Sequence, residues 1–146
     1  MNLGFIGAGL VLGLSALGSA AGIAIAGQAV IGAWKKCYIA NRPAPTTLIA
    51  FGGAPLTQTI YGFILGLLYM KPAAMANPEL GLLYLAMGVA AGLAIGGSAI
   101  AQGMAGAAGA DATGETGKGF VNYMMIVGIC ETVAIFVMAL SMISLG

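Results

Sequence analysis

The sequence predicts an all-α membrane protein with four transmembrane helices, arranged as two tandem-duplicated antiparallel hairpins. The chain is 60% apolar and only 6% charged, with a mean hydropathy of +1.03. Water-soluble domains carry about 25% charged residues. The apolar residues gather in four segments, each long enough to cross a bilayer, for which about 20 residues suffice. The second half of the chain also repeats the residue pattern of the first.

Composition excludes several classes of protein. At 146 residues we expect a single domain, too short for a membrane enzyme with a large soluble head. The net charge is +1 and no basic cluster is present, so no nucleic-acid partner is expected. Histidine is absent, and Cys37 and Cys130 form no Cys-x-x-Cys pair, so a zinc or redox centre is not expected either.

Short polar links separate the expected helices. These links contain every charged residue except Glu131, and we place Cys37 in the first of them. Prolines break helical hydrogen bonding, so Pro43 and Pro45 are expected to end the first helix. Pro72 and Pro78 are expected to bracket the second link. The expected helices are Gly4–Ala33, Thr46–Met70, Leu80–Ala108 and Gly119–Leu145.

The basic residues predict the orientation of the chain in the cell membrane. Most of the lysines and arginines lie in the first and third links, and cytoplasmic loops are enriched in these residues. We therefore expect the loops around 34–45 and 109–118 to be cytoplasmic and both termini to lie outside. Because no positive charge precedes the first apolar run, we also expect no cleaved signal peptide.

Glycine is concentrated in the first and third helices, at four-residue spacings such as Gly18/Gly22 and Gly88/Gly92/Gly96. Small residues at this spacing let helix backbones approach closely in lipid. We expect the first and third helices to form a crowded inner layer and the bulkier second and fourth helices to face outward.

The two halves of the chain align. The stretch from Gln58 to Phe63 in the second helix matches the stretch from Glu131 to Phe136 in the fourth, so that an amide stands where the other copy has an acid. Gly18-Ser19 similarly matches Gly97-Ser98. The predicted division is a first hairpin, 1–73, without a carboxylate, and a second hairpin, 74–146, that carries Glu131.

Glu131 lies in the middle of the fourth apolar segment, with no basic residue near it in the sequence. A carboxylate at the centre of a membrane helix costs about 2.5–3.5 kcal/mol and by default marks an ion or substrate path. A buried acid that only joins helices is the structural alternative. We interpret Glu131 as the carrier of a monovalent cation.

Other polar residues are predicted to lie at the level of Glu131. In an antiparallel hairpin, residues equidistant from the turn share a depth, which places Gln102 beside Glu131, and the repeat places Gln58 there too. Ala54, Thr57, Gln58 and Tyr61 follow one face of the second helix. Pro55 lacks an N–H and is expected to kink this helix and loosen nearby carbonyls.

These groups predict a cation site built from oxygen ligands, which hard cations prefer. A proton needs only the carboxyl group, so the surplus of oxygens favours Na+ over H+. Interhelical hydrogen bonding is the alternative role of the two glutamines. No nucleotide is expected, because the Gly114–Gly119 stretch departs from the phosphate-loop pattern at Ala112 and Gly119.

The sequence resembles the proteolipid (K or c) subunit of V-type and A-type rotary ATPases, in its form with two fused hairpins. The resemblance covers essentially the whole chain. It rests on the stretch from Pro55 to Tyr61, on Ala101-Gln102-Gly103 and on Cys130-Glu131-Thr132.

The resemblance implies a non-catalytic rotor subunit. Identical copies would form a ring in the bilayer and turn past a stator subunit that offers an arginine, with a central stalk linking the ring to ATP chemistry in other subunits. It also implies that Na+, or alternatively H+, is held by Ala54, Thr57, Gln58, Gln102 and Glu131, with Tyr61 bonding the carboxylate. The alternative function is a small four-helix cation-coupled secondary transporter or channel, although many transporters have inverted rather than parallel repeats.

Overall fold

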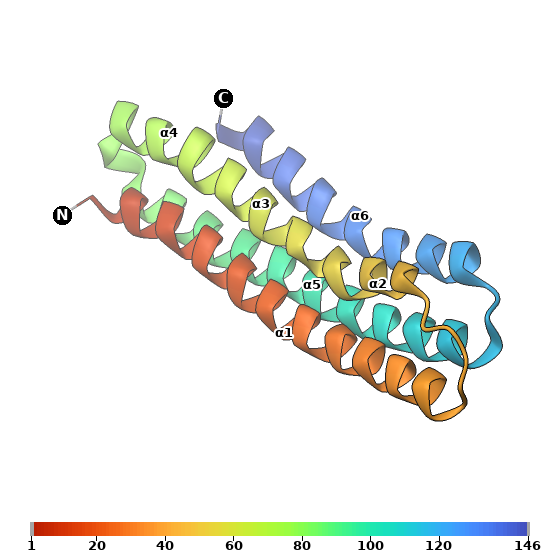
Figure 1. Cartoon of the computed structure of the whole chain (residues 1–146). Coiled ribbons are helices and arrows are strands. Elements are labelled where there is room, and N and C mark those ends of the chain that lie inside the picture. Colours follow the sequence, from red (N-terminus) through yellow and green to blue (C-terminus); the bar gives the residue numbers. More distant parts are fainter. Residues whose placement is uncertain (1, 146) are drawn as a thin grey trace.

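The computed structural model describes residues 2–145, and these fold into four long helical rods that run side by side in alternating directions (Figure 1). The first rod is α1 (Leu3–Ile39) and the fourth is α6 (Phe120–Leu145). The third is the 3₁₀ turn Pro78–Leu80 followed by α5 (Gly81–Thr116). The all-helical fold predicted from the sequence is confirmed.

The second rod runs from Thr46 to Ala76 and changes its winding along its length. It comprises the 3₁₀ turn Thr46–Leu48, α2 (Ile49–Gly53), the 3₁₀ turn Ala54–Leu56, α3 (Thr57–Phe63), the π-helical segment Ile64–Met70 and α4 (Lys71–Ala76). The tight turn and the wide segment therefore flank α3 on either side.

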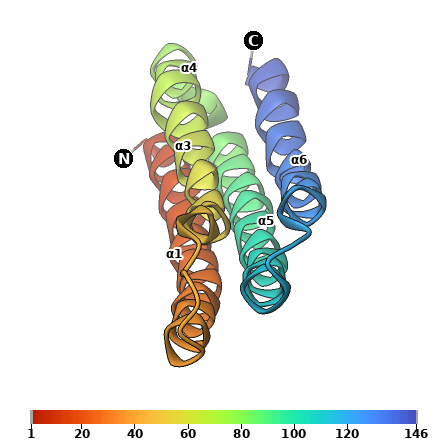
Figure 2. The same ribbon diagram turned by 45° about the vertical axis from the view of Figure 1, so that its right-hand side comes forward.

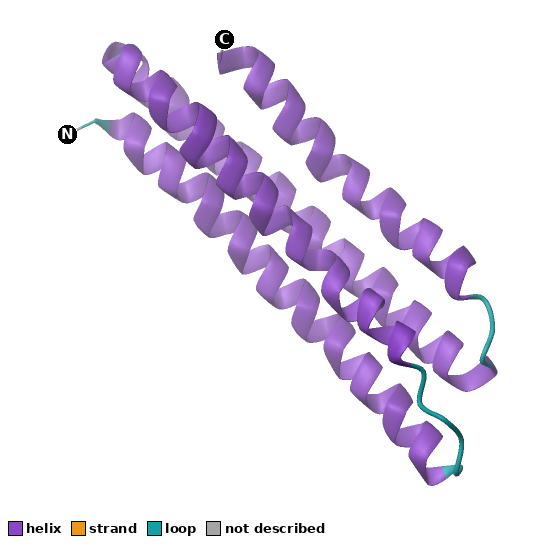
Figure 3. Ribbon diagram, turned by 45° about the horizontal axis from the view of Figure 1, so that its top comes forward, coloured by secondary structure: helices purple, strands orange, loops and turns teal. Residues whose placement is uncertain are grey.

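All four rods are long and apolar enough to cross a membrane, so the chain is a multi-pass membrane protein. The N- and C-terminal ends lie at one end of the bundle, near the turn that follows α4 (Figure 1). The loops after α1 and α5 lie at the opposite end (Figure 3). The two links that the sequence predicts to be cytoplasmic therefore lie at the same end of the bundle.

Three helices are longer than the sequence predicted. α1 continues through Lys35 and Lys36, and α5 continues to Thr116, so Asp111 and Glu115 are helical rather than parts of a loop. The prediction ended each helix where its apolar run ended. Lysine, glutamate and alanine are good helix formers, and the extra turns need no lipid. At 37 residues, α1 is about 55 Å long, well beyond the roughly 30 Å hydrocarbon core.

Two predictions about the links are therefore wrong. Cys37 does not lie in a polar loop but in the last turn of α1, where it is buried. Pro72 does not bracket a turn, because the second rod continues to Ala76. Pro72 stands in the first turn of α4, directly after the π-helical segment Ile64–Met70. The boundary drawn at residue 73 thus falls within α4, and the division into two hairpins remains a proposal from sequence symmetry.

α1 and α5 pack with their backbones in contact, as the glycine spacing predicted. A Cβ atom at Gly18 would overlap the main chain of Gly96 on the other helix. Only glycine permits this approach, and close backbone approach is how membrane helices associate. The glycine pairs that meet in this way are Gly7 with Gly88, Gly18 with Gly96 and Gly22 with Gly103.

α6 lies at the edge of the bundle beside α5 (Figure 2). Within Phe120–Leu145, only Val127 and Ala134 are buried. Large apolar side chains such as Phe136 and Ile143 are 67% and 75% exposed. Such a surface suits lipid or another apolar partner. α6 therefore contacts the bundle along one face, through two buried side chains and several partly buried ones.

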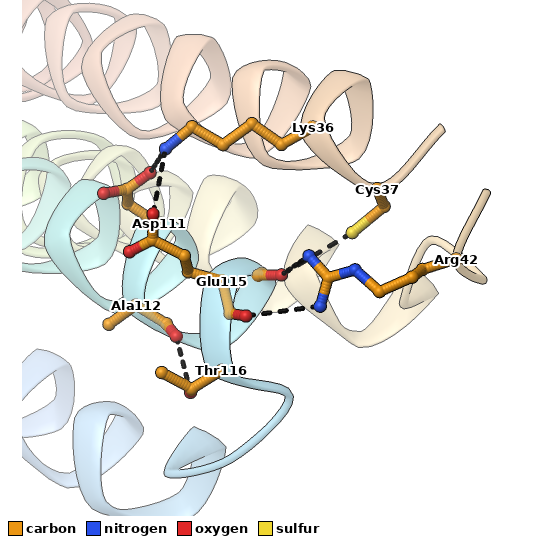
Figure 4. Close-up of polar contacts among 8 residues, drawn as sticks. Lys36, Cys37, Arg42, Asp111, Ala112, Glu115 and Thr116 are labelled. Carbon is orange, nitrogen blue, oxygen red and sulfur yellow. Dashed lines mark hydrogen bonds and ion pairs between the residues drawn. The ribbon is translucent and has the colours of Figure 1, made fainter. Parts of the chain in front are cut away.

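The loop ends of α1 and α5 are tied together by polar contacts (Figure 4). Lys36 Nζ lies 2.8 Å from Asp111 Oδ1 and 3.9 Å from Glu115 Oε1. Arg42 donates to the carbonyls of Glu115 and Gly114, and the Cys37 thiol donates to the Gly114 carbonyl. These contacts connect the ends of the two glycine-rich helices.

Candidate functional site

Glu131 sits halfway along α6, between two apolar clusters of the core. Val127, one turn before it, belongs to a cluster with Leu48 and Phe51, and Ala134 belongs to a cluster with Val11 and Leu65. Among the described residues, Glu131 has no ion-pair partner; the ion pairs all involve Lys36 at the loop end. The carboxylate is thus held in apolar surroundings by neutral groups.

Two donors reach the carboxylate. The Tyr61 phenol on α3 donates to Glu131 Oε1 at 2.5 Å, and Gln102 Nε2 on α5 donates to Glu131 Oε2 at 3.3 Å. Both oxygens of the acid therefore accept hydrogen bonds from other helices.

Gln102 is the centre of the polar network. Its side chain is fully buried, and its Nε2 atom also donates to the main-chain carbonyl of Val127 at 3.0 Å. Its Oε1 atom accepts a hydrogen bond of 2.8 Å from Gln58 Nε2. One amide therefore links α3, α5 and α6 at a single level.

The second helix adds three oxygens. Thr57 Oγ1 lies 3.1 Å from the Ala54 carbonyl oxygen and 3.2 Å from Gln58 Oε1. The local cause is the 3₁₀ turn Ala54–Leu56, which starts beside Pro55 and directs the Ala54 carbonyl toward Thr57. The sequence predicted a disturbance at Pro55, and the structure places a tightened turn there.

The structure thus brings together every residue that the sequence singled out for the site. We call this set the Glu131 cluster. Its members supply one carboxylate, two amide oxygens, a hydroxyl, a main-chain carbonyl and a phenol. The cluster consists of Ala54, Thr57, Gln58, Tyr61, Gln102 and Glu131.

The oxygens of the Glu131 cluster could bind a hard monovalent cation. Carboxylate and neutral oxygens are the ligands that hard cations prefer. No group of three or more His, Cys, Asp or Glu residues that could hold a metal occurs in 2–145. A single carboxylate among neutral oxygens can balance one positive charge.

Sequence reasoning missed two serines beside the cluster. Ser98 Oγ on α5 donates to the Cys130 carbonyl at 2.7 Å, and Ser19 Oγ on α1 accepts the Thr59 N–H at 3.1 Å. The repeat had aligned Ser19 with Ser98, which was the available signal. Neither contact follows from helix periodicity, because both end on main-chain atoms.

Comparisons with known proteins find similarities that together span most of the chain. Residues 85–144 match the family of ATP synthase C subunits, and this segment includes Gln102 and Glu131. The chain is also 38% identical over 135 residues to the A-type ATP synthase subunit K of Methanocaldococcus jannaschii. That similarity covers 92% of this chain and 57% of the relative, so the chain spans little more than half the length of that protein.

Proposed function

From its similarity to ATP synthase C subunits and to an A-type ATP synthase subunit K, we propose that the chain is a proteolipid rotor subunit of a rotary ATPase that binds one Na+ at Glu131 and carries it across the membrane interior. The observation that supports this most is the environment of Glu131. This acid lies at the middle of its helix, is surrounded by neutral oxygens and has no ion-pair partner in 2–145. One bound cation would balance its charge.

The ligands in this proposal are Glu131, Thr57, Gln58, Gln102 and the Ala54 carbonyl. Thr57 and Gln58 already lie within hydrogen-bonding distance of one another, and Gln58 of Gln102. Small side-chain rotations would turn these oxygens toward a shared ion. Tyr61 would stay outside the ligand set and hold Glu131 Oε1 in place.

We favour Na+ over H+ because the Glu131 cluster holds more oxygens than a proton needs. A proton requires only the carboxyl group, whereas a hard cation takes several oxygen ligands. Thr57 Oγ1 lies within hydrogen-bonding distance of the Ala54 carbonyl oxygen and of Gln58 Oε1, so three such oxygens lie together on the second rod.

The ion-loaded site and the empty site are stable in different surroundings. With Na+ bound, Glu131 is neutralised and can face lipid at tolerable cost. Without it, the charged acid needs water or a cation such as the arginine of a stator subunit. We propose that this difference couples ion movement to rotation.

The wider assembly follows from the same proposal. Copies of the chain would form a ring, with α1 and α5 on the inside and the exposed faces of α6 outward. A stator and a central stalk would be its partners, and the ATP chemistry would lie in other subunits, so that this chain is not itself an enzyme. The loops after α1 and α5 would be cytoplasmic, with both chain ends outside. The transporter alternative is not favoured by the similarities found.

The experiment that tests the ion is carbodiimide modification of Glu131 in the purified protein, with and without Na+ at fixed pH and ionic strength. Choline replaces Na+ in the control. Protection that saturates with Na+ and not with choline is expected. Labelling that depends on pH alone would assign the site to H+ and overturn the Na+ proposal.

A further inference from the structure

Two equivalent serines of the repeat hold the main chain next to the two equivalent residues of the Glu131 cluster. Ser98 Oγ donates to the carbonyl of Cys130, the residue before Glu131. Ser19 Oγ accepts the N–H of Thr59, the residue after Gln58. Both serines are buried, with 6% and 2% exposure. Neither bonds a side chain of the cluster.

Two hydrogen bonds from α5 end on the main chain of α6. Ser98 holds the Cys130 carbonyl and Gln102 holds the Val127 carbonyl. Residues three apart lie on the same face of a helix, so both bonds restrain the side of α6 that faces α5. Apolar packing adds two buried side chains of α6 and several partly buried ones. Hydrogen bonds are directional, so these two bonds restrain the rotation of α6 about its axis more tightly than the apolar contacts do.

Rotation of α6 decides where the carboxylate lies. The carboxylate of Glu131 projects several ångströms from the helix axis, so a rotation of about 10° moves it by about 1 Å. Functional sites require side chains within about 0.5 Å and 10–20° of the productive geometry. A small loss of rotational restraint would therefore separate Glu131 from Tyr61 and Gln102.

The same reasoning applies to α3. The second rod changes from a 3₁₀ turn to an α-helix at Thr57. Ser19 Oγ accepts the Thr59 N–H in the first turn of that helix. This contact fixes the start of α3, which carries Thr57 and Gln58.

We propose that Ser98 and Ser19 are positioning residues for the ion site: each hydroxyl fixes the rotation of an outer helix and so sets the ion affinity without touching the ion. This inference rests on the proposed function, since it assigns the serines to the same cation site. It differs from ordinary interhelical bonding, which would contribute to stability alone.

The test compares Ser98→Ala with Ser98→Thr, which keeps the hydroxyl, and with Ser15→Ala. Ser15 is the matched control because it is a buried serine whose hydroxyl bonds only its own helix, at Val11 O. For each variant we would measure the Na+ concentration that half-protects Glu131 from carbodiimide, and separately the thermal unfolding midpoint. Ser98→Ala is expected to raise the half-protecting concentration about tenfold, as loss of an outer contact does at metal sites. Ser19→Ala is also expected to raise the half-protecting Na+ concentration.

Ser98→Thr and Ser15→Ala are expected to stay near the wild-type value. The inference is overturned if Ser98→Ala binds Na+ like the wild type, or if Ser15→Ala shifts the affinity equally. If the wild-type protein shows no Na+ protection, the Na+ proposal fails separately. The positioning role is then judged by the pH midpoint of Glu131 labelling, which Ser98→Ala must shift and Ser15→Ala must not.

Discussion

The phenol oxygen of Tyr61 lies 2.5 Å from Oε1 of Glu131, so a side chain of the second rod holds the acid of the fourth. The contact joins α3 to α6. It leaves the other carboxylate oxygen to Gln102. The acid is thus oriented by two hydrogen-bond donors, and each donor can be removed separately by substitution.

Tyr61→Phe removes only the hydroxyl. A hydrogen bond to a charged group contributes about 1.5–3 kcal/mol. Part of that value is recovered when Glu131 finds water, so we expect about a tenfold weaker Na+ affinity. The measurement is the Na+ dependence of carbodiimide labelling. Tyr69→Phe, on the exposed side of the second rod, is the control. An unchanged affinity in Tyr61→Phe would show that the phenol does not orient the acid.

Glu131→Gln is expected to abolish ion-driven function while the protein still folds. The amide has nearly the same shape, and it can still accept from Tyr61, but it cannot balance a cation. The measurement is ATP-driven ²²Na+ uptake by the reconstituted complex, together with a check of subunit assembly. Glu79→Gln, an exposed acid outside the bundle interior, should transport normally. Residual Na+ uptake in the Glu131 variant would remove this residue from the ion path.

The depth at which the site residues meet could be predicted from the sequence, whereas the helix ends and the contacts between helices could not. Gln102 was placed beside Glu131 because residues equidistant from the turn of an antiparallel hairpin lie at the same depth. The ends of α1 and α5 were misplaced because helical hydrogen bonding does not stop where apolar residues stop. Near and within the π-helical segment from Ile64, Gly62 and Gly66 lie close against Ser15 and Ala8 of α1. Such contacts are specified by tertiary packing, which residue periodicity does not encode.

Gln102→Leu is expected to impair both the site and the fold. The substitution removes the partner of Gln58 and a donor to Glu131. A buried polar group left without a partner costs about 1–3 kcal/mol. We therefore expect a lower thermal unfolding midpoint and loss of Na+ protection at Glu131. Gln28→Leu, an exposed position on α1, is the matched control and should change neither measurement. Normal Na+ protection in Gln102→Leu would exclude this amide from the site.

Gly18→Ala tests the contact between α1 and α5. A methyl group there would overlap the main chain of Gly96, and overpacking typically costs about 1–3 kcal/mol. Gly13→Ala is on the same helix, and its Cβ would have no atom within 4 Å. We expect Gly18→Ala to lower the unfolding midpoint in detergent, followed by circular dichroism, and Gly13→Ala to leave it unchanged or slightly higher. Equal midpoints for the two variants would contradict the tight helix crossing.

The thiol of Cys37 should be protected from modification, because the last turn of α1 is docked onto α5. Its sulfur lies 3.6 Å from the Gly114 carbonyl oxygen, and the residue is only 2% exposed. The variant Cys130→Ala makes Cys37 the sole thiol of the chain. A polar maleimide should react with Cys37 at least about tenfold more slowly than with a cysteine introduced at exposed position 38. The reason is that reaction at Cys37 requires local opening of the helix end. The control is therefore Tyr38→Cys in a chain lacking both native cysteines. Denaturation in detergent should equalise the two rates. Fast labelling of Cys37 in the folded protein would show that the charged end of α1 is frayed. It would then support the sequence prediction that Cys37 lies in a loop.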